Sequence, residues 1–172
     1  MKKVFFLLLV LSFNIYPQFD TLLFEKELSP YKYGVAALGD QNSDGCDDIL
    51  IYDCNENKAS VYFGGSPMDT IPEIEFQIPN IFRLINAVAV DVNNDEKKDI
   101  MFSYTIEDST SPTSFSVKVV IYYGGELLDS FPDIFWKFPE VITNGGNMLY
   151  PLEDFNGDGK PDIMMYCIYP PP

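Results

Sequence analysis

Three stretches of the sequence place oxygen-bearing side chains at alternate residues. They are DQNSDGCDD from Asp40, DVNNDEKKD from Asp91 and DFNGDGKPD from Asp154. In each stretch aspartate occupies positions 1, 5 and 9, and asparagine occupies position 3. Hard cations such as Ca²⁺ bind six to eight oxygen atoms and tolerate irregular geometry, and a tightly wound loop can turn alternate side chains toward one point. The three stretches therefore predict calcium-binding loops.

The predicted ligand set is the same in every loop. Positions 1, 3, 5 and 9 supply side-chain oxygens, and the backbone carbonyl of position 7 supplies a further oxygen. Glycine at position 6, which is Gly45 in the first loop and Gly159 in the third, permits a sharp turn. The predicted metal ligands are Asp40, Asn42, Asp44, Cys46, Asp48, Asp91, Asn93, Asp95, Lys97, Asp99, Asp154, Asn156, Asp158, Lys160 and Asp162.

The middle loop departs from this pattern. Glu96 replaces the glycine at position 6, and Lys97 and Lys98 bring positive charge beside the site. Whether the middle loop holds Ca²⁺ is therefore left open by the sequence. Asp47, at position 8 of the first loop, is expected to be a solvated carboxylate.

An EF-hand and a metal-free acidic turn are the alternatives to a calcium-binding loop between strands. An EF-hand needs a bidentate glutamate at position 12 and a helix after it. Position 12 here is Ile51, Phe102 or Met165, and strand-like residues follow, which disfavours an EF-hand. A set of acidic β-turns without metal stays open, although carboxylates packed closely together repel one another unless a cation lies between them.

The acidic stretches belong to a longer repeat. The segments VYFGG and IYYGG end at Gly65 and Gly125, and MDTIPEIEFQIP at 68–79 matches LDSFPDIFWKFP at 128–139. Each unit contains a short apolar strand, the acidic loop, a β-rich strand, a strand that ends in Gly-Gly, and an alternating strand bounded by prolines. Four short antiparallel strands per repeat are typical of a β-propeller blade. The sequence therefore predicts an all-β fold of propeller-like blades.

The set of blades is predicted to be partial. DTLLFEKELSP, before the first loop, resembles the last strand of a preceding unit, and the third unit ends soon after its loop. The chain thus holds about two full blades plus partial ones, whereas a closed propeller has at least four. We expect either a piece of a longer chain, with further blades elsewhere, or self-association. The polar stretch EDSTSPTSFS around Pro112 is expected to be a longer loop.

The acidic loop, the strand after it and the Tyr-x-Gly-Gly end resemble the FG-GAP repeat and the related VCBS repeat. The resemblance covers roughly residues 31–166 and assigns 19–172 to a repeat region like the propeller of the integrin α-subunit. It implies that the predicted ligands bind Ca²⁺ in the hairpin between the first two strands of each blade. It also implies a non-catalytic binding or adhesion module with a protein or glycan ligand.

The first 18 residues have the features of an export signal. Lys2 and Lys3 precede an apolar run of about ten residues, which is shorter than the roughly 20 residues that span a bilayer. We expect cleavage between Phe13 and Phe19, and a secreted, extracellular or cell-envelope location. Later segments are too short or too polar to be membrane spans. A buried strand is the alternative for this segment.

Composition excludes several classes of function. The formal net charge of −15 argues against binding nucleic acid or anionic membranes. The chain contains no histidine, which removes Ser-His-Asp and Cys-His catalysis. We therefore expect no enzymatic activity and no catalytic residue. The alternative is the propeller portion of a larger secreted enzyme that acts on polysaccharide.

Several single residues carry further expectations. Cys46 and Cys54 are not expected to form a disulfide, because eight residues of strand span roughly 26 Å against a limit of ~7 Å. The three cysteines, including Cys167, are expected to be small buried thiols. Trp136 is expected in a blade core. Glu73 and Asp133, which recur after prolines, are expected to be structural.

Overall fold

The protein is built from β-strands. The computed structural model describes residues 4–7, 11–13, 17–19, 25–28, 33–65, 71–78, 83–107, 115–126, 128–141, 147–152 and 154–167. Every regular element within these ranges is a strand. In the same residues no helix is long and apolar enough to cross a membrane. The all-β prediction is confirmed.

Two four-stranded sheets follow one another along the chain. The first contains β5 (Tyr33–Gly39), β6 (Asp48–Asp53), β7 (Lys58–Tyr62) and β8 (Ile74–Gln77). The second contains β9 (Arg83–Val90), β10 (Asp99–Glu107), β11 (Phe115–Tyr122) and β12 (Ile134–Val141). Neighbouring strands in both sheets are antiparallel and lie in sequence order. Both predicted blades of four strands are therefore confirmed.

A third sheet contains β13 (Asn147–Pro151) and β14 (Ile163–Cys167), which pair antiparallel. It corresponds to the first two strands of the third predicted unit. In the stretch expected to be a longer loop, β10 extends to Glu107 and β11 begins at Phe115. Residues 108–114, between these strands, lie outside the described part of the chain. The three sheets match the predicted partial set of blades.

The N-terminal strands form separate pairs. β1 (Val4–Leu7) pairs with β4 (Glu25–Leu28), and β2 (Leu11–Phe13) pairs with β3 (Pro17–Phe19). The stretch DTLLFEKELSP therefore contains a strand, as predicted, but this strand pairs with β1. Parts of the predicted signal, at residues 1–3, 8–10 and 14–16, lie outside the described residues. Export stays a prediction.

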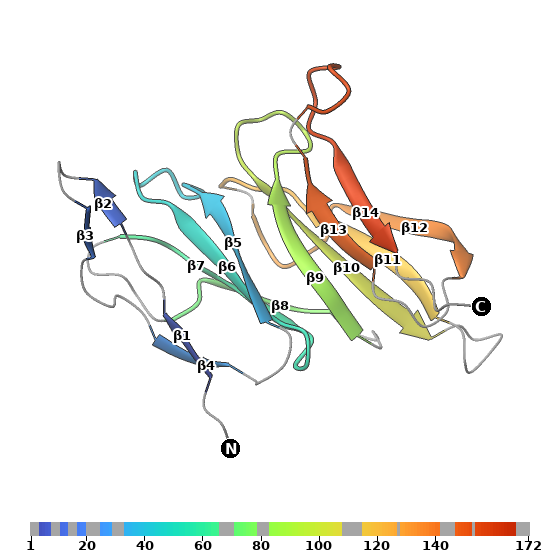
Figure 1. Ribbon diagram of the computed structural model, residues 1–172, viewed down its shortest axis with the longest axis horizontal. Helices are drawn as coiled ribbons and strands as arrows, with labels where there is room; N and C mark the ends of the chain where they lie inside the picture. Colours follow the sequence, from blue (N-terminus) through green and yellow to red (C-terminus); the bar gives the residue numbers. More distant parts are fainter. Residues whose placement is uncertain are drawn as a thin grey trace.

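The three main sheets lie side by side. Figure 1 shows their first strands, β5, β9 and β13, running in the same direction, with β9 between the other two. β9 contacts both β5 and β13. Because each acidic loop joins the first strand of a sheet to the second, all three loops emerge at the same end of the molecule (Figure 1). The repeat thus lines up three acidic loops along one edge.

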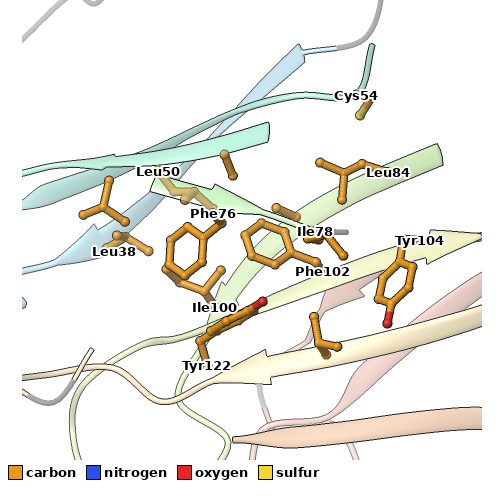
Figure 2. Packing of buried hydrophobic residues seen from close by; sticks show 14 residues of the cluster. Leu38, Leu50, Cys54, Phe76, Ile78, Leu84, Ile100, Phe102, Tyr104 and Tyr122 are labelled. Atoms are coloured by element: carbon orange, nitrogen blue, oxygen red, sulfur yellow. The ribbon is translucent and has the colours of Figure 1, made fainter. Parts of the chain in front are cut away.

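The first and second sheets enclose the main hydrophobic core. Alternate residues of β6 and β7, such as Leu50 and Val61, face the second sheet and are fully buried. Phe76 on β8 packs its ring edge-on against Tyr122 and Phe102, with ring centroids 4.7 and 5.4 Å apart (Figure 2). Burying a phenylalanine of this kind contributes ~1.5–3 kcal/mol. Successive side chains of a strand point to opposite faces of its sheet, so only every second residue faces this core.

The second and third sheets enclose a smaller core. Met101, Val119 and Ile121 of the second sheet pack with Leu149 of β13, and Met165 of β14 lies partly buried against them. Along β10 and β11, the residues in this core alternate with those that face the first sheet. The second sheet is therefore apolar on both faces, as a sheet enclosed between two others must be.

Trp136 is not a core residue, so that prediction is wrong. Its side chain is 53% exposed, whereas Phe76, at the same position of the first repeat, is 1% exposed. Strands β10 and β11 cover Phe76, as its contacts with Phe102 and Tyr122 show. Trp136 lies on β12, beyond the described strands of the third sheet, which contact β9 and β10. Its exposure therefore follows from the smaller size of the third sheet.

Candidate metal centre

The three acidic loops share one backbone conformation. In each loop the residues at positions 4 and 6 have positive φ, which turns the chain sharply twice within three residues. The φ values are 63° and 89° for Ser43 and Gly45, 61° and 71° for Asn94 and Glu96, and 81° and 82° for Gly157 and Gly159. The middle loop therefore makes the same turn as the others, although Glu96 occupies a conformation that costs an L-residue about 1–2 kcal/mol.

Side chains at positions 1, 3 and 5 hold the first loop together. The carboxylate of Asp40 accepts hydrogen bonds from the backbone N–H groups of Asp44 (3.1 Å) and Gly45 (2.9 Å). The Asn42 side chain accepts from the same Asp44 amide at 3.1 Å and donates to the Asp44 carboxylate at 3.0 Å. Asp44 in turn accepts from the amide of Cys46 at 2.8 Å. The hydrogen bond from Asn42 is the main reason why the pKa of Asp44 lies below its ordinary value.

The other two loops repeat this pattern bond for bond. Asp91 and Asp154 each accept from the amides at positions 5 and 6, and Asn93 and Asn156 each accept from the amide at position 5. Asp95 and Asp158 accept from the amides of Lys97 and Lys160 at 2.9 Å. The same residue types thus build the same loop three times.

The aspartate at position 9 has a role that the sequence did not reveal. Asp48 and Asp99 are both fully buried. Each accepts one hydrogen bond from the position-2 amide of its own loop, and a second, at 2.8 Å, from the amide of Gly64 or Gly124. Burial raises the pKa of both carboxyl groups, and the two amide hydrogen bonds act in the opposite direction. This side chain ties each loop to the Gly-Gly end of the third strand.

The first glycine of each Gly-Gly pair is required by this contact. A Cβ atom on Gly64 would lie 2.3 Å from the backbone carbonyl oxygen of Asp47, and one on Gly124 would lie 2.3 Å from that of Lys98. Backbone atoms cannot move aside as a flexible side chain can, so larger residues are excluded. The joint occurrence of the acidic loop and Gly-Gly in each full repeat was the sequence signal for this link.

The third loop replaces the glycine contact with a local one. Asp162 accepts from the backbone amides of Phe155 (2.8 Å) and Asn156 (3.0 Å), and from the Asn156 side chain at 3.1 Å. Unlike Asp48 and Asp99, Asp162 is only partly buried. Among the described residues, position 9 therefore stabilises the third loop through contacts within the loop itself.

The donor set suits a hard cation, but the structure does not gather it into a cluster. Among the described residues, no three Cys, Asp or Glu side chains are grouped in a way that could hold a metal ion. The carboxylates of positions 1, 5 and 9 instead accept hydrogen bonds from backbone amides. A carboxylate has about four lone-pair sites, so an oxygen that accepts one amide proton can also bind a cation. The chemistry of the loops fits calcium, and the ligand assignments stay predictions.

The lysines of the middle loop contact the first loop and the strand before it. Lys97 Nζ donates to the backbone carbonyl of Asp40 and, at 3.2 Å, to Ser43 Oγ. Lys98 Nζ donates to the carbonyl of Ala37 at 3.1 Å. Lys97 thus joins the middle loop to the first loop, and Lys98 joins it to β5.

Gln41, at position 2 of the first loop, links the first and second sheets. Its side chain is buried, and its amide nitrogen donates to the carbonyls of Leu38 (2.8 Å) and Lys98 (3.1 Å). Its oxygen accepts from the amide of Gly125 at 2.6 Å. The sequence does not single out Gln41, because two of its three partners, Lys98 and Gly125, are distant in the chain.

Glu73 and Asp133 are structural, as predicted. Glu73 Oε2 accepts from the amide of Phe63 at 2.9 Å, and Asp133 Oδ2 accepts from the amide of Tyr123 at 2.7 Å. Each carboxylate therefore fastens the segment before the fourth strand to the end of the third. The repeat preserves this contact in both full sheets.

The cysteines match their predictions in part. Cys46 and Cys54 form no disulfide, and Cys54 is buried. Cys46 is only partly buried, because it lies at position 7 of a solvent-facing loop, so its predicted burial is wrong. The side chain of Cys167 lies outside the described part. Asp47 is exposed, as predicted.

Comparison with known proteins does not assign the chain to a family. No protein-family model matches the chain, and no curated protein matches it significantly.

Proposed function

We propose that the chain is an exported, calcium-stabilised repeat module of the FG-GAP type, with a non-catalytic role in binding or adhesion. The observation that supports this proposal is the threefold recurrence of one acidic loop with the same turns and the same hydrogen bonds. Each loop offers two aspartates and an asparagine, at positions 1, 5 and 3, that are exposed or only partly buried. Oxygen donors of this kind suit Ca²⁺.

Calcium would act here as a structural ion. The predicted ligands at positions 1, 3, 5, 7 and 9 of each loop would hold it, and the hydrogen bonds already present would keep the backbone in the turn. Extracellular sites with dissociation constants of about 10⁻⁴–10⁻³ M are of the class that suits such modules. An ion that binds only the folded loop stabilises the folded chain by mass action.

Calorimetry with Ca²⁺ tests the proposal. We expect two or three bound ions per chain and a lower melting temperature after chelation with EDTA. Asp44→Asn should remove or weaken one site, because it removes a carboxylate from the exposed part of the first loop. Asp47→Asn is the matched control, since this neighbouring carboxylate is exposed and lies outside the predicted ligand set. Absence of bound Ca²⁺, together with an unchanged melting temperature, would contradict a calcium role.

Export and ligand binding are separate parts of the proposal. Expression of the full chain with its first 18 residues, followed by N-terminal sequencing of the exported product, tests the signal. We expect a new N-terminus between residues 14 and 20. A product that retains Met1 in the cytoplasm would contradict export. The expected ligand is a protein or a glycan, which would bind the loop-bearing surface.

A further inference from the structure

The third sheet leaves one face uncovered. Leu149 and Met165 point toward the second sheet and are buried or partly buried. The residues that alternate with them point the opposite way and are 41–54% exposed. We call these four residues the outer face of the third sheet: Met148, Tyr150, Met164 and Tyr166.

The same face is covered in the other two sheets. Position 11 of the repeat, counted from the first aspartate of each loop, is Leu50, Met101 and Met164. Leu50 is 0% exposed and Met101 is 1% exposed, because the next sheet packs on each of them, whereas Met164 is 47% exposed. Among the three described sheets of the repeat, the third therefore leaves to solvent the packing face that the other two bury.

The third loop shows the same difference. Position 2 is Gln41 in the first loop, where it is buried and bonded to the second sheet. In the third loop it is Phe155, which is 84% exposed. Two independent positions of the third repeat are thus apolar and exposed where the first repeat contacts another sheet.

The composition of the outer face favours a second copy of this chain as its partner. None of its four side chains carries a charge, so two copies can meet without burying like charges. The cross-strand pairs are Met148 with Tyr166 and Tyr150 with Met164. The face is therefore a square with methionine on one diagonal and tyrosine on the other.

This arrangement is complementary to itself. Sheets that pack face to face usually keep their strands nearly aligned. A two-fold axis in the interface plane, either along or across the strands, then places each methionine over a tyrosine of the other copy. Sulfur–aromatic contacts of this kind are favourable. A two-fold axis also closes the assembly at two copies.

We propose that the chain forms a two-fold symmetric dimer in which the outer faces of two third sheets pack together. The dimer gives each third sheet the apolar cover that the first and second sheets receive within one chain. Because each copy carries a net charge of −15, the two chains repel at long range. Salt screens this repulsion, so dimerisation should strengthen as salt is added.

Sedimentation equilibrium of the full chain, at several concentrations and at low and high salt, tests the proposal. We expect a monomer–dimer equilibrium that shifts toward dimer with added salt. The double variant Met148→Lys/Met164→Lys should raise the dimer dissociation constant by about 30-fold or more, because it places charges in the apolar contact. Ile71→Lys is the matched control, since Ile71 is 68% exposed and lies in the first repeat.

Circular dichroism checks that the variants are folded. If the double variant unfolds, the single variant Met164→Gln, which keeps a similar size, replaces it and should weaken the dimer by about tenfold. A wild-type monomer at every concentration would overturn the proposal and leave the face to a different polypeptide. A mass that grows beyond two copies, or a folded double variant that dimerises normally, would also overturn it. So would a dimer that dissociates when salt is added.

Discussion

Replacing Gln41 with methionine should loosen the junction between the first and second sheets. Methionine has a similar length, so the buried space stays filled, but it cannot make the three side-chain hydrogen bonds to Leu38, Lys98 and Gly125. The substitution therefore separates hydrogen bonding from packing. The loss falls on backbone groups of both sheets, of which Leu38 is buried and Gly125 is partly buried.

The size of the effect follows from the number of bonds. A hydrogen bond of this kind contributes about 0.5–1.5 kcal/mol, and a buried partner left unpaired costs more, so three bonds predict a loss of about 3 kcal/mol. In a chain of 150–250 residues, each kcal/mol shifts the melting temperature by about 2–4 °C. Gln41→Met should therefore lower the melting temperature by about 6–12 °C.

Denaturant and thermal unfolding, followed by circular dichroism, measure this loss. Phe155→Met is the matched control, because it places the same residue at the same loop position where the side chain is 84% exposed. The control should change stability by no more than about 0.5 kcal/mol. If Gln41→Met melts within about 2 °C of the wild-type chain, the hydrogen bonds of Gln41 do not stabilise the junction.

Three further substitutions or measurements test other parts of the structure. Asp48→Asn should lower the stability of the fold by about 1–3 kcal/mol, because its NH₂ group would face a backbone donor, although removal of the buried charge offsets part of this loss. Asp47→Asn, measured in the same unfolding experiment, should be nearly neutral. Equal effects of the two substitutions would contradict the link between Asp48 and the Gly-Gly end. Glu96→Gly should raise stability by about 0.5–1 kcal/mol, because it relieves a positive φ of 71°; a less stable variant would argue against strain. In the folded chain iodoacetamide should label Cys46 faster than Cys54, because Cys46 is only partly buried, whereas Cys54 is buried and burial raises its pKa to about 12. Burial also raises the pKa of Cys46, so labelling should be slow at both thiols near neutral pH. Peptide mass mapping that finds Cys54 labelled as fast as Cys46 would contradict this reasoning.

The local part of the fold could be predicted from the sequence. Strands alternate apolar residues with period two, and the aspartate and asparagine positions define each loop within nine residues. Strands β5–β14 therefore appear where the repeat places them. The positive φ at Glu96 was harder to predict, because glycine is the usual residue there and the surrounding hydrogen bonds impose the turn.

The contacts between sheets could not be predicted in the same way. Asp48 was assigned to calcium alone because its partner Gly64 lies 16 residues away, on the third strand. Gln41 was not singled out, because Gly125 lies 84 residues away. In both cases the partner is fixed by how strands and sheets stack, and no local spacing carries that information.

The sequence by itself determined the repeat, the strand order within each sheet and the chemistry of the three loops. These features depend on residue type and on neighbours within a few positions, so they do not require contacts with distant parts of the chain. Only the tertiary structure decided which apolar faces are covered. Phe76 is buried and Trp136 is exposed, although both occupy the same position of the repeat, because burial depends on whether another sheet lies alongside.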